Sequence, residues 1–202
     1  MSEEKTVVSK PLLADPSALG LFGLAIITLV ASTQKFGFTE GTAGVLAWAI
    51  FLGGCMQLIA GVIDFKKDNV FGGTAFIGYG FFWLAMAFSW LVSLGIFGEQ
   101  AQEIFDSTQT GVAFVAYLIF TAFMTIGALK TTKVLFFIFL FIDFLFIGLA
   151  LSSFHIAYEA THMLAAVSEL LISLLSFYGA GANVLNKHYG RQVLPLGKAF
   201  VA

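Results

Sequence analysis

The sequence predicts an all-α integral membrane protein with six transmembrane helices. Hydrophobic residues make up 59% of the 202 residues and charged residues only 11%, whereas a soluble domain carries about 25% charged residues. The mean hydropathy is +0.94. Apolar stretches alternate with short polar segments, and each is close to the roughly 20 residues that a helix needs to cross a bilayer. No segment is left for a separate soluble domain.

The first helix is predicted to follow a polar tail, residues 1–14. Asp15 suits the N-cap, and Pro16 suits the first helical position, where its missing N–H costs nothing. Gly20 and Gly23 allow another helix to approach closely. Because the first amides of a helix lack partners, this start can attract an anion, and Gly20 is a candidate substrate contact.

The remaining helices follow with short connections. The turn 64–69 is charged and tight, the turn 130–133 is minimal, and residues 186–202 form a polar tail. A transmembrane domain therefore covers residues 15–185. The predicted spans are 17–33, 42–63, 71–97, 110–129, 134–152 and 163–185.

The lysines and arginines predict the orientation. Nine of the ten fall in the two tails and in the turns 64–69 and 130–133, and only Lys35 falls on the opposite side. Because positive charge favours the cytoplasmic side, both termini are predicted to be cytoplasmic, in a multi-pass protein of the plasma membrane. No Lys or Arg lies within a predicted span.

Several functional classes are excluded. The net charge of −2 and the lack of a basic patch argue against nucleic acid. Cys55 is the single cysteine, and hydrolase and phosphate-binding motifs are absent, so neither enzyme activity nor a cofactor is expected. His155, Glu159 and His162 have the i, i+4, i+7 spacing of one helix face, but lack a further ligand. We expect no metal there.

Polar residues at mid-membrane depth are the first candidates for a substrate path. Counting from the cytoplasmic ends places Leu24, Gln57, Tyr79, Thr121 and Ile142 about 10–14 Å into a core about 30 Å thick. The polar members either bond between helices or line a watery passage, because an unpaired polar group is costly there. Gln57, Tyr79 and Thr121 are thus candidate substrate contacts, and Thr28 in the first span is a further one.

Two acidic residues also lie within spans. Asp143 is at mid-depth in the fifth span, and Glu169 lies about two turns below the outer end of the sixth. Neither has a Lys or Arg partner within the predicted spans. Buried acids of this kind are candidates for proton coupling or gating, and the alternative is a protonated acid bonded to a neighbouring helix.

Several ordered motifs resemble those of the acetate uptake transporter family, also called succinate–acetate permeases. Asp15-Pro16-Ser17-Ala18-Leu19-Gly20-Leu21 is similar to the entry of that family's first helix. Phe51-Leu52-Gly53-Gly54-Cys55-Met56-Gln57 is similar to its second-helix motif, and Lys66 to Phe76, Tyr79 to Leu84 and Gly190 to Gly197 continue the similarity. The resemblance covers nearly the whole chain.

This resemblance implies a six-helix bundle, assembled as a homo-hexamer, that passes acetate and sometimes succinate. It also implies a narrow hydrophobic constriction at mid-membrane. The positions that match it are Leu24, where the family has an aromatic residue, Tyr79 and Ile142.

The favoured hypothesis is therefore transport of acetate and related small carboxylates, channel-like or proton-coupled. Acetate is almost entirely an anion at neutral pH, so helix ends and neutral donors would attract it before its methyl group passes the constriction. The alternatives are a membrane sensor or structural oligomer, in which the polar residues only join helices, and a pore for another small solute.

Overall fold

A computed structural model describes residues 13–201, and this part of the chain is helical without β-strands. Six stretches are long and apolar enough to cross a membrane, which confirms the six predicted helices. α2, η1 and α3 are continuous and make up the second of these stretches. The elements are α1 (Ser17–Lys35), α2 (Val45–Ala47), η1 (Trp48–Met56), α3 (Gln57–Lys66), α4 (Val70–Ser93), α5 (Glu99–Glu103), α6 (Ser107–Ala128), α7 (Lys133–Ser153) and α8 (Tyr158–Tyr189).

The start of α1 differs by one residue from the prediction. Pro16, not Asp15, is the N-cap, and the helix begins at Ser17. The Asp15 carboxylate still serves this helix end, because its Oδ1 accepts hydrogen bonds from the Ser17 amide at 2.9 Å and from the Ser17 hydroxyl at 2.7 Å. Asp15 therefore satisfies one of the free amides from just outside the helix.

Two other helix ends differ from their predicted positions, for local reasons. α4 ends at Ser93 rather than at Phe97, because the chain turns through Gly95, whose φ of +76° suits a glycine. The last helix begins at Tyr158, five residues before its predicted start, and runs for 32 residues. Apolar periodicity locates the centre of a helix better than its ends.

The middle of the second span is a π-helix, η1, which the sequence does not predict. This geometry is rare and is often found near functional sites. A side chain at Gly23 of α1 would overlap the Leu52 carbonyl of η1, and one at Gly53 would lie 2.7 Å from the Trp83 ring of α4. Both glycines therefore let neighbouring helices contact η1 closely. η1 ends immediately before Gln57.

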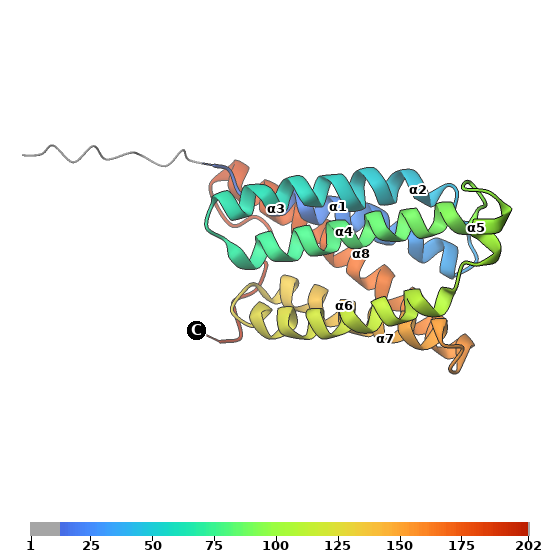
Figure 1. The fold of residues 1–202 in the computed structure, drawn as a ribbon. Coiled ribbons are helices and arrows are strands. Elements are labelled where there is room, and N and C mark those ends of the chain that lie inside the picture. The colour runs from blue at the N-terminus through green and yellow to red at the C-terminus, as the bar shows by residue number, and fades with distance from the viewer. Residues whose placement is uncertain (1–12, 202) are drawn as a thin grey trace, which may run out of the picture.

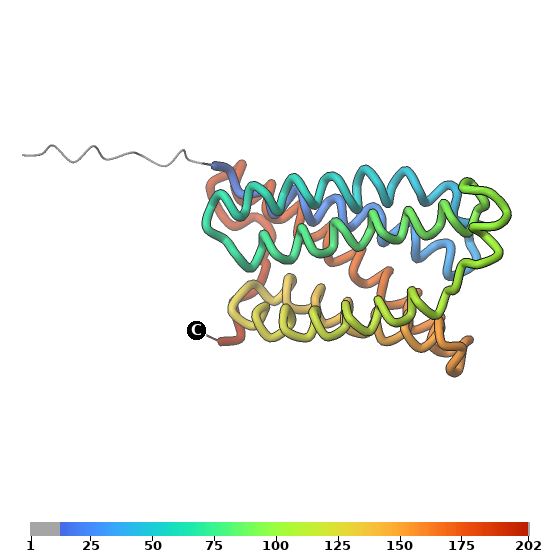
Figure 2. The backbone as a smooth tube through the Cα atoms, in the orientation of Figure 1, coloured from blue at the N-terminus to red at the C-terminus, as the bar shows by residue number. Residues whose placement is uncertain are grey.

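The helices form two groups with α8 crossing between them, as Figures 1 and 2 show. One group holds α1, η1, α3 and α4, and the other is the α6–α7 hairpin. α8 packs extensively against both α1 and α7. The backbones of α4 and α6 come close at few positions, and aromatic side chains make most of the contact between these two helices. Residue 13 and the C-terminal segment lie at the same end of the bundle, which we call the termini end.

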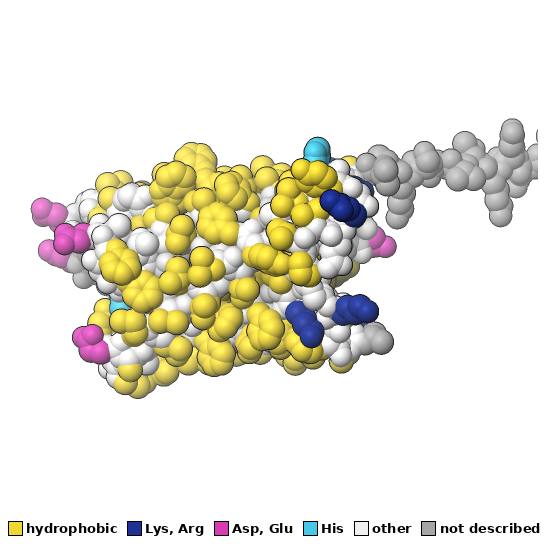
Figure 3. Space-filling view, turned by 180° about the vertical axis from the view of Figure 1, so that it is seen from behind, with side chains coloured by type: hydrophobic (Ala, Val, Ile, Leu, Met, Phe, Trp, Pro, Cys, Tyr) yellow, Lys and Arg dark blue, Asp and Glu magenta, His cyan; other side chains and the backbone are white. Residues whose placement is uncertain are grey.

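The surface has an apolar middle and differently charged ends (Figure 3). Lysine and arginine side chains gather at the termini end, and most of the visible acidic side chains gather at the opposite end. Exposed Phe, Ile and Val side chains cover the intervening surface. This distribution suits a protein whose middle contacts lipid and whose two ends contact water.

Candidate functional site: a cavity and its apolar neck

A cavity of about 720 Å³ extends from the termini end into the bundle. Asp15 and Lys130 line it near the termini end, and Leu24, Tyr79 and Ile142 line it deeper in the bundle. This main cavity lies between the two helix groups, since its lining comes from α1, α3 and α4 on one side and from α7 and the α6–α7 turn on the other, with Gly179 and Asn183 of α8 between them. It has the size of a site for small molecules.

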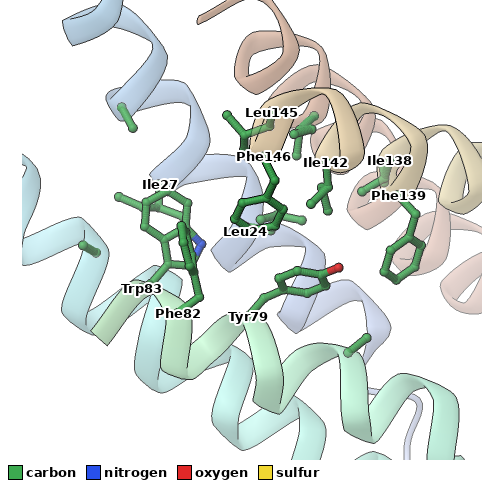
Figure 4. Close-up of a cluster of buried hydrophobic side chains, with 14 of the residues drawn as sticks. Leu24, Ile27, Tyr79, Phe82, Trp83, Ile138, Phe139, Ile142, Leu145 and Phe146 are labelled. Carbon is green, nitrogen blue, oxygen red and sulfur yellow. The ribbon is translucent and has the colours of Figure 1, made fainter. Parts of the chain in front are cut away.

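Leu24, Tyr79 and Ile142 come from α1, α4 and α7 and project into the same space (Figure 4). Their exposed fractions are 7%, 5% and 4%, so three separate helices place buried side chains at this level. We call these three residues the neck. Two of them are aliphatic, and the third presents an aromatic ring, so the neck suits a methyl group better than a charge.

The hydroxyl of Tyr79 is occupied by another side chain. It lies 2.9 Å from Thr121 Oγ1, and the Thr121 hydroxyl itself donates to the Tyr117 carbonyl oxygen at 2.7 Å. Because a hydroxyl has one proton, Tyr79 must be the donor to Thr121. Thr121 is fully buried and does not line the main cavity. In this arrangement Thr121 restrains Tyr79, and the hydroxyl proton of Tyr79 points away from an arriving anion.

Gln57 presents a free donor to the same cavity. Its side chain is 1% exposed and lines the main cavity, and its amide Nε2 has no hydrogen-bond partner among the described residues. An unpaired buried amide is costly, and a carboxylate oxygen would satisfy it. The C-terminal end of η1 fixes the position of this residue at the first turn of α3.

Thr28 and Gly20 lie outside the cavity lining. The Thr28 hydroxyl donates to the Leu24 carbonyl oxygen one turn earlier in α1, at 2.7 Å. A side chain at Gly20 would overlap the ring of Phe76, which does line the cavity. The structure therefore gives these residues local packing contacts, and their role as substrate contacts stays a prediction.

An aromatic layer lies beyond the neck. Phe82, Tyr117 and Phe146 have ring centroids 5.1–5.4 Å apart, so each ring contacts the other two. A second cavity of about 250 Å³ is lined by Phe82, Phe114 and Tyr117 but not by Tyr79 or Ile142. The layer thus separates the two cavities, and the route between them is closed in this conformation.

Neither predicted intramembrane acid lines the main cavity, and one has a cationic partner. Asp143 Oδ2 accepts a hydrogen bond from the Thr125 hydroxyl of α6 at 2.6 Å. Glu169 Oε2 lies 2.8 Å from Lys35 Nζ, so the expectation that it has no Lys or Arg partner is wrong. The reason is that α1 continues to Lys35, two residues beyond its predicted end. Proton coupling at these acids stays a prediction.

The histidine motif does not form one helix face. His155 precedes α8 and has a φ of +58°, whereas Glu159 and His162 are within the helix. The His162 ring stacks on Tyr158 with centroids 5.3 Å apart. In residues 13–201 no group of three or more His, Cys, Asp or Glu side chains is arranged to hold a metal ion.

The mouth of the main cavity carries mixed charge. Partial burial opposes ionisation of Asp15, but the two hydrogen bonds from Ser17 and the charge of Lys67 outweigh it and lower the pKa of Asp15. Lys67 Nζ lies 3.9 Å from Asp15 Oδ1. Asp64, expected in a solvated turn, is instead 1% exposed and lines the cavity. Sequence analysis missed it because it begins a run of charged residues.

The C-terminal segment contributes the last part of the wall. Leu196 and Gly197 line the cavity. The Leu196 carbonyl oxygen accepts from the Val134 amide at 3.1 Å, and the Phe200 amide donates to the Leu129 carbonyl oxygen at 2.9 Å. Hydrogen bonds therefore hold this segment across the α6–α7 turn, beside the cavity mouth.

Known proteins resemble this chain, two of them over more than nine-tenths of its length. The succinate-acetate/proton symporter SatP of Escherichia coli (strain K12) is 34% identical over 188 residues, which are 93% of this chain and 97% of that protein. Acetate permease A of Emericella nidulans is 33% identical over 141 residues, 66% of this chain and 47% of that protein. A solved structure of the bacterial acetate channel SatP matches with a TM-score of 0.84 and 35% identity, over 92% of this chain and 100% of that chain.

These matches confirm the resemblance to the acetate uptake transporter family. Together with the six apolar helices, they make the chain a multi-pass protein of the cell membrane. The sequence profile of the GPR1/FUN34/yaaH family matches residues 2–196. The chain therefore belongs to the GPR1/FUN34/yaaH family.

Proposed function

We propose that this protein passes acetate and related small carboxylates, succinate among them, across the cell membrane through the main cavity and the neck. The observation that carries the proposal is the buried, unpartnered amide of Gln57 in a cavity that reaches Leu24, Tyr79 and Ile142. A carboxylate supplies an acceptor for this amide, and the methyl group of acetate suits the apolar neck. The acetate and succinate-acetate transport proteins that resemble this chain support the same substrate class.

Passage requires the aromatic layer of Phe82, Tyr117 and Phe146 to open, because it separates the two cavities. Because the layer is densely packed, one of its rings can rotate aside and join the two cavities only if the neighbouring side chains shift as well. We infer that the structure represents a closed conformation, in which substrate enters from the termini end. Both channel-like and proton-coupled passage are compatible with this gate.

Uptake of radiolabelled acetate into proteoliposomes tests the proposal. Empty vesicles of the same lipid correct for acetic acid that crosses the bilayer unaided. We expect flux above that baseline for the parent and a clear loss for Gln57→Leu, which keeps the size but removes the amide. Gln100→Leu is the matched control, because Gln100 is exposed on α5 at the other end of the bundle. Parent flux equal to that of empty vesicles would overturn the proposal.

The same preparation separates the alternatives. A sensor or structural oligomer would bind acetate or remain inert without passing it. A pore for another solute would show flux that an excess of unlabelled acetate does not reduce. For this chain we further propose a homo-hexamer with both termini cytoplasmic, as the resemblance and the lysine distribution predict. Native mass spectrometry measures the number of subunits, and the accessibility of tags at the two termini shows on which side of the membrane they lie.

A further inference from the structure

Asp64 combines a buried carboxyl group with a position in the wall of the main cavity. The side chain is 1% exposed, and neither Oδ1 nor Oδ2 has a hydrogen-bond partner among the described residues. Its backbone is fixed by the turn that follows, because the Asp64 carbonyl oxygen accepts from the amides of Lys67 and Asn69 at 3.0 Å each. The turn therefore directs a carboxyl group inward, although its neighbours 65–70 are exposed.

The neighbouring helix leaves room for this carboxyl group. A side chain at Gly72 of α4 would overlap Asp64 Oδ2. Gly72 thus permits Asp64 to occupy the space between α3 and α4, where the Asn69 side-chain amide is close enough to act as a donor, although its geometry is too poor for a well-formed hydrogen bond. The fit indicates a formed site rather than a side chain that has turned inward by chance.

The charges that face Asp64 do not neutralise it. Asp15, before α1, is a second acid on the same cavity wall, and Lys67, at the end of α3, is the nearby cation. Lys67 is 3.9 Å from Asp15, so its charge is shared between the two acids. Lys130 lines the cavity from the α6–α7 turn, and α8 contributes the neutral Asn183.

A carboxyl group in this setting can readily gain or lose its proton. Its charged form has only the Asn69 side-chain amide as a nearby donor and lacks most of its hydration, whereas the cavity gives solvent protons access to it. A carboxylate substrate in the same cavity adds a further negative charge. Protonation of Asp64 would remove that repulsion and convert an acceptor into an O–H donor.

We propose that Asp64 is the proton-binding residue of this cavity, and that it takes up one proton from the solvent at the termini end when a small carboxylate enters. The neutral acid then donates a hydrogen bond to the carboxylate, or to a water between them, and the proton is released when the carboxylate leaves. Binding of the proton and of the carboxylate are therefore linked, and each favours the other. This inference rests on the proposed function of the cavity.

Proton uptake by the purified, full-length protein tests the inference. Acetate at neutral pH is added to protein in weakly buffered detergent solution of the same pH, and a pH indicator dye reports the protons taken up. Acetate binding is measured separately, as the increase in the unfolding temperature that acetate causes. The parent is expected to bind acetate and take up about one proton per occupied site.

Three variants identify the residue that holds the proton. Asp64→Asn is expected to bind acetate with almost no proton uptake, because its amide imitates the neutral acid. Asp64→Ser is a second neutral variant, used if the amide prevents folding, and Asp64→Glu is expected to retain the uptake. Asp68→Asn is the matched control, since Asp68 is an exposed acid four residues away whose φ of +67° asparagine tolerates.

The outcomes separate this inference from the proposed function. Acetate binding without proton uptake in the parent would overturn the role of Asp64 and leave acetate transport standing. Undiminished uptake in folded Asp64→Asn or Asp64→Ser would also overturn it, because the proton would then be on acetate or on another residue. Absence of acetate binding in the parent would contradict the proposed function itself, and the inference with it.

Discussion

The hydroxyl of Tyr79 in α4 donates a hydrogen bond to Thr121 Oγ1 in α6, over 2.9 Å and near the middle of the bundle. Few backbone positions of α4 and α6 lie close together, so side chains join the two helix groups here. Tyr117 Oη donates to the Gly78 carbonyl oxygen at 3.0 Å, and the Tyr79–Thr121 bond is a second link, beside the neck. It also determines what the neck presents to a substrate, because it directs the Tyr79 proton away from the cavity.

Thr121→Val is therefore expected to alter both stability and affinity. Valine removes the acceptor and leaves the Tyr79 hydroxyl unpaired, which lowers the free energy of unfolding by about 1–2 kcal/mol. The released hydroxyl can then donate to a carboxylate, so acetate should raise the unfolding temperature more in the variant than in the parent. Thr121→Ser keeps the acceptor and is the control. An unchanged acetate response in Thr121→Val would show that Tyr79 does not reach the substrate.

The Lys35–Glu169 ion pair is expected to contribute to stability through its burial. The side chains are 12% and 2% exposed, and Lys35→Met would leave the Glu169 carboxylate buried without a cation. Removal of one partner of a buried pair costs about 3–5 kcal/mol. The double variant Lys35→Met/Glu169→Leu should recover most of that loss. Thermal unfolding in detergent measures both changes, with Lys66→Met, at an exposed position, as the control. Equal unfolding temperatures for Lys35→Met and Lys66→Met would contradict the prediction.

Two glycines are expected to respond oppositely to the same substitution. An alanine Cβ at Gly148 of α7 would lie 2.7 Å from the Thr161 carbonyl oxygen and 2.8 Å from the Ala165 amide of α8. Backbone atoms cannot yield easily, so Gly148→Ala should destabilise the protein by about 1–3 kcal/mol. Gly181→Ala, in α8, meets no atom within 4 Å and should stabilise by about 0.5–1 kcal/mol. Thermal unfolding distinguishes them, and a similar shift in both variants would show that α7 and α8 do not pack this closely.

The sequence predicts well those features that depend on local spacing. Six apolar stretches of bilayer length suffice for six helices, and the fixed rise of a helix places Leu24, Tyr79 and Ile142 at one level. Three different helices do bring these side chains to one cavity. The rise per residue gives the depth of a side chain in the membrane, but it does not give the direction in which that side chain points around the helix axis. For this reason Gln57 lines the cavity whereas Thr121, counted to a similar depth, does not.

The features that the sequence does not predict depend on distant partners. Lys35 and Glu169 are separated by 134 residues, and only the packing of α1 against α8 joins them. Asp64 resembles a solvated turn residue, because its inward direction is a property of the turn and of the space left by Gly72. The π-helix changes the register before Gln57 without a sequence signal of its own.

The final prediction concerns the passage of substrate through the aromatic layer. Phe146 of α7 is 1% exposed and contacts both Phe82 and Tyr117, with centroids 5.2 and 5.4 Å away. Phe146→Ala removes the ring that spans the layer, so the two cavities can join, and flux should rise. The rise should be larger for succinate than for acetate, because the wider opening removes a limit that affects the larger anion more.

The space that the Phe146 ring vacates costs about 3–5 kcal/mol of stability, and Phe146→Leu offers a milder test if that loss prevents folding. Phe144→Ala is the matched control, because Phe144 is on the same helix with 41% of its surface exposed. A succinate-to-acetate flux ratio equal in Phe146→Ala and Phe144→Ala would mean that substrate takes a route that avoids this layer.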